Sequence, residues 1–354
     1  MDKFEERKQD HIRLSLSSAV EAFGGSGFDK IQLLHEAMPE LDFDQVDIST
    51  VIFDQRIATP FYVSSMTAGH RDADPLNRVL AAACRRRGWT MGVGSQRRQL
   101  IEKPNLSEWD RFRKDFPELK IMGNIGLSQA ISSHSEEIQH LADSLQAWAM
   151  IVHANALQEC LQPEGTPQFS GGYQALARLT QDLSVPVVWK ETGCGVNSLT
   201  LNKLLGTGLA AVDVSGYGGT HWGRIEGARA KADDLRKEAA ESFSDWGIGT
   251  VDAILSAKEL APLREGSGKC SLWASGGVRT GVDSAKCFAL GADYVGFAKP
   301  ALVAALKGEE FLNRWMEARE FELKTAMFCL GISQIAEFRQ RQVWKWRQSP
   351  VTKN

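Results

Sequence analysis

Lys190 is the side chain whose position makes the strongest chemical demand. It ends the apolar run VPVVWK, where an unpaired ammonium group would be costly to bury. Adjacent side chains of a strand point to opposite faces, so Glu191 is not its natural partner. We therefore expect an anionic cofactor or substrate beside Lys190. A lysine that simply reaches solvent at the strand end explains the sequence equally well.

A glycine pair further along the chain predicts a phosphate site. Gly276 and Gly277 follow the apolar run SLWAS, and two glycines free the backbone to bend around an anion. Thr280 can cap a helix that starts near Gly281, whose first N–H groups attract negative charge. In a (β/α)₈ barrel the loops after the seventh and eighth strands commonly hold phosphate, and this stretch lies where those strands would fall. A plain tight turn is the alternative.

The segment HANALQE carries a candidate metal ligand. His153 and Asn155 share a strand face, and the chain then turns through Gln158 and Glu159 toward a helix. A carboxylate at Glu159 could hold a Mg²⁺ ion that also takes phosphate oxygens, because Mg²⁺ prefers oxygen ligands and keeps several waters. A surface glutamate is the alternative, since no aspartate pair lies nearby.

Basic residues near the N-terminus predict a diphosphate clamp. In RKQDHIR, Arg7 and His11 are four residues apart and would share a helix face, with Lys8 beside them. Neighbouring cations repel unless an anion neutralises them, and Arg97 could add a bidentate contact to the same group. A flexible basic arm is the alternative.

These residues need a scaffold, and the hydrophobic pattern predicts a TIM barrel. Eight apolar runs alternate with helix-length amphipathic segments, which is typical of a parallel α/β fold. We predict strands over residues 61–65, 91–94, 120–123, 147–152, 186–190, 211–215, 271–275 and 294–298. Helices are predicted over 75–87, 135–145, 172–183, 198–205, 251–263 and 282–290. Polar or glycine residues follow every strand, as any strand end requires, but in a barrel they would converge on one mouth.

The chain reads as one domain with three parts. Residues 1–59 form an N-terminal arm, 60–306 the barrel, and 307–354 a C-terminal helical extension, in which Phe311, Leu312, Trp315 and Met316 recur at helical spacing. The long segment 216–250 follows the sixth strand, where a lid or binding loop is expected.

Composition and cysteine spacing argue against several classes of protein. The 354 residues are 43% hydrophobic and 24% charged with a net charge of -3, which describes an ordinary globular chain and gives no general case for nucleic-acid binding. The N-terminus has no apolar leader and no run reaches membrane-spanning length, so we expect a cytoplasmic protein without a membrane partner. The cysteines form no C-x-x-C pair, which argues against a structural zinc site or a disulfide framework.

Together these motifs resemble type 2 isopentenyl-diphosphate isomerases, the flavin-dependent kind. Matching segments run in order along nearly the whole chain: RKQDHIR, PFYVSSMTAGH, MGVGSQR, GNIG, HANALQE, VVWKETGCG, VDVSGYGGTHWGRIE, ASGGVRTG and GFAKPAL. The resemblance implies a TIM barrel that binds FMN and assembles as a homo-tetramer or homo-octamer. It also implies interconversion of isopentenyl and dimethylallyl diphosphate, which requires reduced FMN, Mg²⁺ and a reductant such as NADPH.

The resemblance assigns roles residue by residue. FMN would contact Ser65, Met66, Thr67, Ser95, Asn124, Lys190, Ser215 and Thr220, and its phosphate would contact Gly276, Gly277, Arg279, Ala298 and Lys299. The substrate would be bound by Arg7, Lys8, His11, Ser95, Gln96, Arg97, His153, Asn155 and Gln158. The catalytic groups would be His153, Gln158, Lys190 and Glu226, with Glu159 on the metal. Lys190 near the flavin N1 would favour an anionic reduced ring.

Three positions depart from the family pattern. Ala68 stands where a second glycine is common, so a positive φ there would strain it modestly. His221 replaces a smaller or amide side chain, which could change the packing at the flavin edge. Lys299 replaces a frequent glycine and adds a charge that suits a phosphate.

Two other functions fit parts of the sequence. FMN-dependent 2-hydroxy-acid oxidoreductases share such a barrel and phosphate turn, but they carry a catalytic histidine followed by glycines and arginine, a run that GGTHWGRIE lacks. A non-catalytic barrel that binds phosphate ligands is the other alternative, and a protein that binds no flavin would favour it.

Overall fold

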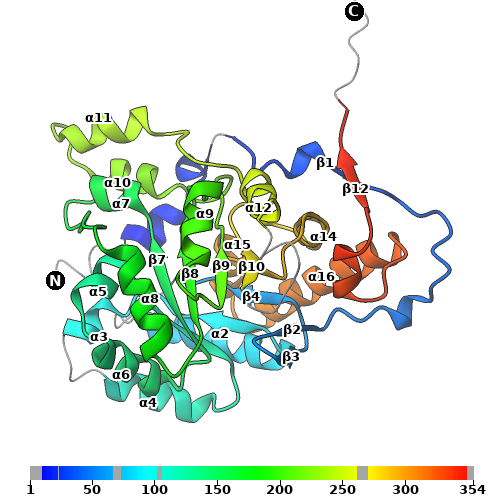
Figure 1. Ribbon diagram of the computed structural model, residues 1–354, viewed down its shortest axis with the longest axis horizontal. Helices are drawn as coiled ribbons and strands as arrows, with labels where there is room; N and C mark the ends of the chain where they lie inside the picture. The colour runs from blue at the N-terminus through cyan, green and yellow to red at the C-terminus, as the bar shows by residue number, and fades with distance from the viewer. Residues whose placement is uncertain (1–9, 23, 67–72, 102–105, 261–269, 349–354) are drawn as a thin grey trace, which may run out of the picture.

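The computed structural model describes residues 10–22, 24–66, 73–101, 106–260 and 270–348. Its centre is a closed barrel of eight parallel strands, in which the last strand pairs with the first (Figure 1). The strands are β4 (Phe61–Val63), β5 (Thr90–Gly92), β6 (Ile121–Gly126), β7 (Ala149–Ala154), β8 (Val187–Glu191), β9 (Ala211–Asp213), β10 (Ser271–Ala274) and β11 (Tyr294–Phe297). Each overlaps a predicted strand, so the predicted TIM barrel is confirmed.

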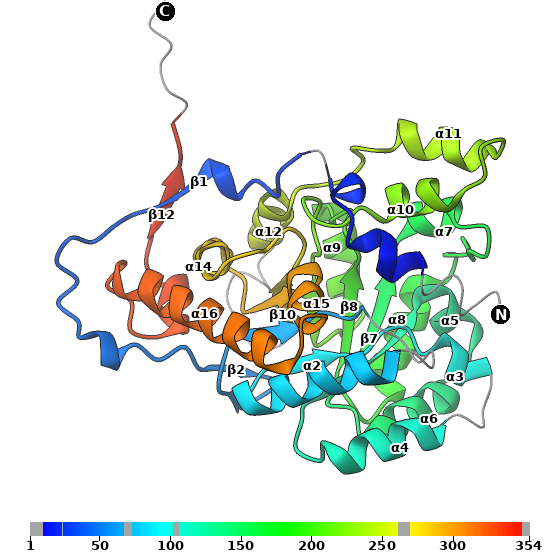
Figure 2. The same cartoon turned by 180° about the vertical axis from the view of Figure 1, so that it is seen from behind.

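Helices surround the barrel on its outer side (Figures 1 and 2). Those that were predicted appear as α2 (Ala73–Arg87), α6 (Ser135–Leu145), α8 (Gly172–Asp182), α9 (Ser198–Leu205), α12 (Thr250–Lys258) and α14 (Gly281–Leu290). Further helices are α3 (Arg97–Ile101), α4 (Leu106–Asp115), α5 (Leu127–Ser132), α7 (Ala156–Leu161), α10 (Trp222–Arg229), α11 (Leu235–Ser242), α15 (Lys299–Ala305) and α16 (Glu309–Phe328). Thr280 caps α14 as predicted, because its hydroxyl accepts from the Asp283 amide at 3.0 Å. None of the helices in the described part of the chain has the length and hydropathy needed to cross a bilayer.

Aromatic side chains fill the N-terminal end of the barrel interior. Tyr62, Trp273 and Tyr294 pack with ring centroids 5.1–5.3 Å apart and are fully buried. A hairpin of β2 (Thr50–Ile52) and β3 (Gln55–Ile57) closes this end, and Phe53 at its turn packs on Trp273. This end of the interior is therefore a packed core and offers no room for a ligand.

On six of the strands, an apolar or aromatic core residue is followed two positions later by a polar residue on the same face. The same strands that supply Tyr62, Met122, Ile151, Val188, Ala211 and Trp273 to this core present Ser64, Asn124, His153, Lys190, Asp213 and Ser275 at the i+2 positions. Side chains two apart share a strand face, so these polar groups also point inward, about 7 Å further along the barrel. The interior thus has an apolar N-terminal layer and a polar C-terminal layer.

Two strands that are far apart in the sequence pair beside the barrel. The strand β1 (Ile31–Leu33) pairs antiparallel with β12 (Trp344–Trp346), the blue and red strands of Figure 1. Helix α16 packs against α2 and α14, which confirms the predicted helical segment. The end of the predicted helical extension is instead a strand, because it continues the edge that β1 provides and buries Trp344 there.

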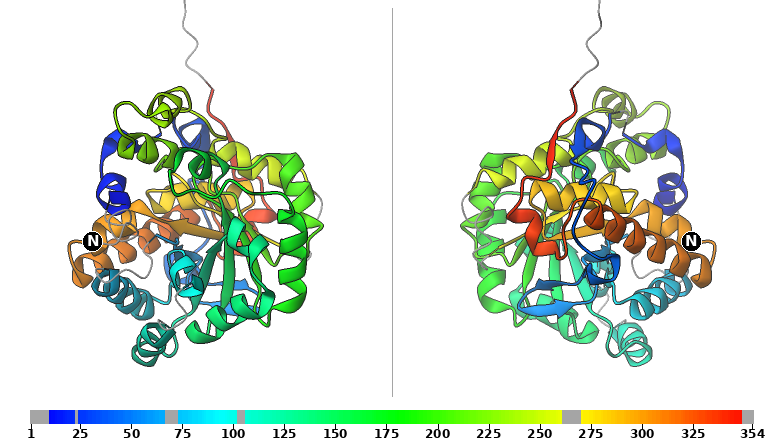
Figure 3. Two further views of the ribbon diagram at one scale, coloured as in Figure 1. Left: turned by 90° about the vertical axis from the view of Figure 1, so that its left-hand side faces the viewer. Right: turned by 90° about the vertical axis from the view of Figure 1, so that its right-hand side faces the viewer.

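The segment 216–250 holds two helices, α10 and α11, and is not an open loop. The N-terminal residues 10–22 lie against it at one end of the barrel (Figure 3). The backbone amide of His221 donates to the Val20 carbonyl at 2.9 Å, and that of Ala22 donates to the Gly219 carbonyl at 2.9 Å. Residues 10–22 and 216–250 therefore pack together over the C-terminal opening of the barrel.

Candidate active site

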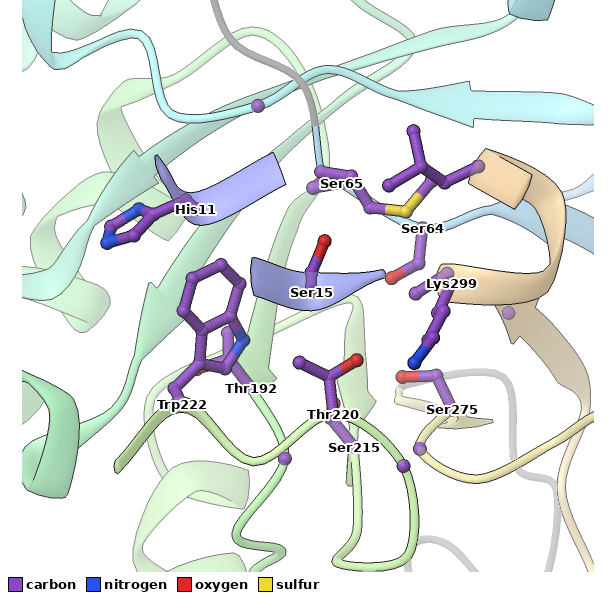
Figure 4. Close-up of a pocket in the computed structure, with 18 of the residues that line it drawn as sticks. His11, Ser15, Ser64, Ser65, Thr192, Ser215, Thr220, Trp222, Ser275 and Lys299 are labelled. Carbon is purple, nitrogen blue, oxygen red and sulfur yellow. The ribbon is translucent and has the colours of Figure 1, made fainter. Parts of the chain in front are cut away.

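A cavity of about 600 Å³ opens at the C-terminal ends of the strands. Residues at or just after all eight strand ends line it, which confirms that the polar strand ends converge on one mouth (Figure 4). The lining residues among the predicted site are His11, Ser65, Met66, Ser95, Arg97, Asn124, His153, Gln158, Glu159, Lys190, Ser215, Thr220, Gly276, Gly277, Arg279, Ala298 and Lys299. A cavity of this size accommodates a cofactor-sized ligand.

Three predicted residues do not line the cavity. Gln96, Asn155 and Glu226 are buried and stand behind the cavity wall. The predictions for Arg7, Lys8 and Thr67, and the departure at Ala68, fall outside the described residues. The roles of all these residues stay predictions.

The phosphate turn has the geometry that its glycines require. Gly276 and Gly277 adopt φ of 92° and 69°, a conformation that L side chains rarely adopt. A Cβ on Gly276 would lie 2.1 Å from the Gly216 carbonyl oxygen, so only glycine fits. The turn therefore brings its backbone close to the loop after β9, next to the cavity.

Two cations flank this turn and share one carboxylate. The Lys299 ammonium contacts Glu21 Oε1 at 2.7 Å, and the Arg279 guanidinium contacts Oε2 at 3.2 Å. Burial alone would raise the pKa of Glu21, but Lys299 and Arg279 outweigh it and hold the pKa below its ordinary value. The departure at Lys299 thus adds a charge that bridges the N-terminal segment and the phosphate turn.

Lys190 finds its anion inside the barrel. Its side chain is buried, which rules out the solvent alternative, and its ammonium lies 2.9 Å from Asp213 Oδ2. It also donates to Ser275 Oγ at 3.1 Å and to the Glu191 carbonyl at 3.0 Å. The sequence analysis proposed a cofactor or substrate as the anion beside Lys190, and the structure supplies a protein carboxylate as well, because Asp213 is its Cα partner on the neighbouring strand.

Glu226 is the centre of a second buried cluster. Its Oε1 contacts His11 Nε2 at 2.8 Å and accepts from Gln158 Nε2 at 3.1 Å, while Oε2 accepts from Arg229 at 2.6 Å. Burial would raise the pKa of Glu226, but His11 and Arg229 outweigh it and the pKa is lowered. The carboxylate is therefore ionised at neutral pH. His11 packs edge-on against Trp222, and Figure 4 shows both on the cavity wall.

His153, Asn124 and Gln96 form a chain of contacts. His153 Nδ1 lies 2.8 Å from Asn124 Oδ1, and the backbone N–H of Asn124 donates to Gln96 Oε1 at 3.0 Å. Gln96 is fully buried, so it holds Asn124 from behind. Asn155 similarly caps α7 by accepting from the Gln158 amide at 2.8 Å. These two predicted substrate contacts are placed where they orient other residues.

Glu159 is the one predicted metal ligand. It lines the cavity, and its Oε2 accepts from the Thr166 amide at 2.5 Å. Within the described part of the chain, no group of three or more His, Cys, Asp or Glu side chains could hold a metal. The residues fit Mg²⁺ only if most of its ligands are water and diphosphate oxygens, a mode of binding that this ion commonly adopts.

Comparisons with known proteins agree with this site. A family model described as FMN-dependent dehydrogenase matches residues 127–345. The isopentenyl-diphosphate delta-isomerase of Legionella pneumophila strain Corby is 48% identical over 339 residues, which cover 96% of this chain and 97% of that protein. The isopentenyl-diphosphate delta-isomerase of Bdellovibrio bacteriovorus is 45% identical and covers 96% of this chain and 98% of that protein. The chain belongs to the isopentenyl-diphosphate delta-isomerase family.

Solved structures of other proteins have the same fold as this isopentenyl-diphosphate delta-isomerase family member. The flavin-binding domain of baker's yeast flavocytochrome b2 matches with a TM-score of 0.64 at 18% identity, over 98% of this chain and 82% of that chain. A mandelate oxidase mutant with (S)-mandelic acid matches with a TM-score of 0.64 at 15% identity, over 98% of this chain and 99% of that chain. At such identities the likeness shows the fold alone.

His221 also separates this isomerase-family chain from an oxidoreductase with a histidine base in this loop. It is fully buried and absent from the cavity lining, at the N-cap of α10. The Arg224 amide donates to Nδ1 at 3.2 Å, so Nε2 carries the proton that the Trp246 carbonyl accepts at 3.1 Å. Burial lowers the pKa of His221. The departure at His221 is therefore a structural cap away from the cavity.

Three residues of the site escaped the sequence analysis. Asp213 lies within the apolar run AVDVS, and a carboxylate at an inward strand position was the available signal. Glu21 carries no local signal, because its partner Lys299 is far away in the sequence. Arg229 lies three residues after Glu226 in α10, a spacing that places the two side chains on one helix face and was an available signal. The long-range contacts required the folded chain.

Proposed function

We propose that this protein interconverts isopentenyl and dimethylallyl diphosphate over reduced FMN, with no net redox change. The reaction adds a proton to one alkene carbon and removes one from another, so one C–H bond forms, one breaks and the double bond moves. One observation carries the proposal. Residues from all eight strand ends line a single cavity, with a phosphate turn on one side and an ionised Glu226 cluster behind another wall.

The residues present fit FMN. The Gly276–Gly277 turn lies between Arg279 and Lys299, so backbone N–H groups are available for the phosphate. The two cations contact Glu21 and would serve the phosphate when it replaces that carboxylate. Lys190 lies in the cavity wall beneath, where it would favour negative charge on the pyrimidine edge of the ring. When bound, reduced FMN supplies a proton-bearing N5 and an electron-rich ring that stabilises developing positive charge.

Glu226 serves as a proton acceptor in this proposal. It is ionised, and both His11 and Gln158 touch it while lining the cavity. An ionised carboxylate has no proton to give, so its role at this point of the reaction is to accept one. His11 and Gln158 therefore connect the buried base with the substrate, and His153 is held in a fixed orientation by Asn124.

Arg97 and the predicted clamp residues Arg7 and Lys8 bind the diphosphate, and Ser95 lies beside Arg97 in the lining. The binding energy of the diphosphate fixes the short hydrocarbon tail against the reacting groups. Glu159 takes part through a Mg²⁺ ion shared with the diphosphate. The resemblance, rather than any contact, further suggests NADPH as the reductant and a homo-tetramer or homo-octamer. The charged N-terminal sequence and the lack of membrane-length apolar runs support a cytoplasmic location.

An anaerobic assay tests this function. The purified protein is loaded with FMN, reduced, and mixed with isopentenyl diphosphate and Mg²⁺ in heavy water. We expect dimethylallyl diphosphate with deuterium detected by NMR, and no product with oxidised FMN. Absence of isomerisation with reduced FMN would contradict the proposal. In a separate anaerobic sample with oxidised FMN, reduction of the flavin by a 2-hydroxy acid would favour the oxidoreductase alternative.

A further inference from the structure

A fully buried carboxylate lies under the floor of the cavity. Asp213 on β9 is 0% exposed and is the Cα partner of both Lys190 on β8 and Trp273 on β10. It belongs to none of the residues that the sequence assigned to the site. The strand register places it at the polar C-terminal layer of the interior, directly above the aromatic core.

Donors surround Asp213 on both of its oxygens. Oδ2 accepts from the Tyr62 hydroxyl at 2.5 Å and contacts the Lys190 ammonium at 2.9 Å. Ser275 Oγ lies 2.9 Å from each oxygen, and the Ser215 amide donates to Oδ1 at 3.0 Å. Burial first, and the neighbouring Asp213 second, raise the pKa of Tyr62 well above its ordinary value. Tyr62 therefore stays protonated and remains a donor.

This network fixes Lys190. An ammonium group has three N–H donors, and those of Lys190 meet Asp213, Ser275 and the Glu191 carbonyl. Ser275 accepts from Lys190 while it donates to Asp213, so it links the two charges. The Glu191 side chain takes no part, because its Oε2 accepts from the Cys194 and Gly195 amides. Asp213 is the carboxylate that balances Lys190 among the described residues.

We propose that Asp213 is a positioning residue that sets the reduction potential of bound FMN through Lys190. It holds the ammonium at the cavity floor and offsets part of its positive charge. A bare cation near the ring would favour the anionic reduced flavin strongly, and the paired cation favours it less. The inference rests on the proposed function only in that FMN binds against Lys190; it does not require isomerisation.

The test is the midpoint potential of bound FMN in Asp213→Asn. The amide keeps the shape of the side chain and can still accept from Tyr62, but the charge is lost. Reduced FMN then becomes the counter-ion of Lys190, so its binding should strengthen relative to oxidised FMN by about 10-fold, which raises a two-electron potential by ~30 mV. An unchanged or lower potential in a folded, FMN-bound variant would overturn the proposal.

Tyr62→Phe is the matched control. It removes a hydrogen bond to Asp213 but leaves both charges, so the potential should stay near that of the unmodified protein. Equal shifts in Tyr62→Phe and Asp213→Asn would indicate a merely structural effect and would overturn the proposal.

A paired variant covers the case in which Asp213→Asn does not fold. Lys190→Met with Asp213→Asn leaves no unpaired buried charge. Because Asp213 acts through Lys190, the potential of this double variant should equal that of Lys190→Met alone. A higher potential in the double variant would mean that Asp213 acts on the flavin directly, which would overturn the proposal. Flavin absorption measures FMN binding without depending on isomerisation. The isomerase assay is done on the unmodified protein and does not depend on the midpoint potentials of the variants. A failed isomerase assay is therefore distinguishable from a failed potential shift.

Discussion

The two layers of the barrel interior differ in kind although the same strands build them. In the N-terminal layer Trp273, Val188 and Ala211 pack in a core that the β2–β3 hairpin closes. Two residues further on, Ser275, Lys190 and Asp213 form a network of hydrogen bonds and charges. A shift of two strand positions, about 7 Å, therefore separates packing from chemistry. Substitutions in the two layers should have different consequences.

Ile52→Ala should produce the largest effect, on stability alone. Ile52 is 2% exposed in the hairpin that closes the N-terminal layer, so truncation leaves a cavity and should lower the free energy of unfolding by about 2–5 kcal/mol. Denaturant unfolding measures the loss, with the 75%-exposed Leu199→Ala as control. Turnover per folded molecule should not change. A parallel fall in turnover would break the separation between the layers.

Glu226→Gln should lower turnover and leave stability unchanged, the reverse of the result expected for Ile52→Ala. The amide cannot accept a proton as the carboxylate does, so turnover should fall by at least ~100-fold while the fold persists. Steady-state kinetics of the reduced enzyme measure the change. Glu164→Gln is the control, because Glu164 contacts the same Arg229 at 3.5 Å but is exposed, whereas Glu226 is buried. Equal activity in the two variants would remove Glu226 from the reaction.

Glu159→Gln should weaken the dependence on Mg²⁺. Loss of a carboxylate from the coordination sphere should raise the half-saturating Mg²⁺ concentration by roughly 10-fold, the size expected for one charged contact. Titration of activity with Mg²⁺ measures this shift, and the exposed Glu136→Gln serves as control. An unchanged requirement would contradict a metal role for Glu159.

Glu191→Gln tests a buried carboxyl group outside both layers of the barrel interior. Glu191 follows Lys190 on the same strand and points to the opposite face. Burial raises the pKa of Glu191 to about 8, against the opposing hydrogen bonds from the Cys194 and Gly195 amides. A raised carboxyl pKa stabilises the fold fully below its unfolded value of 4.5 and loses that contribution as pH rises through 8. Glu191→Gln should flatten the decline of stability between these values. An unaltered pH profile of thermal unfolding would contradict this.

Local sequence signals predicted much of this molecule. The glycine pair at 276–277, the cap at Thr280 and the eight strands depend on neighbouring residues, so they could be predicted without the fold. The register between strands could not be predicted in the same way. Consequently Lys190 was identified as needing an anion, whereas its partner Asp213 on the next strand was not.

Contacts between residues far apart in the sequence could not be predicted from the sequence either. Glu21 meets Lys299 and His11 meets Glu226 only because the N-terminal segment folds over the mouth. The strand β12 depends on an edge offered by β1 more than 300 residues earlier, which the helical pattern of the tail did not indicate. Such features follow from the arrangement of the whole chain.

The distance between Lys190 Nζ and the flavin N1 in a crystal structure of the FMN complex tests the central claim most directly. We expect the phosphate at the Gly276–Gly277 turn and the N1 atom within about 6 Å of the ammonium, close enough for the charge of Lys190 to act on the ring. A flavin bound with its phosphate away from this turn, or with its ring away from Lys190, would contradict the account.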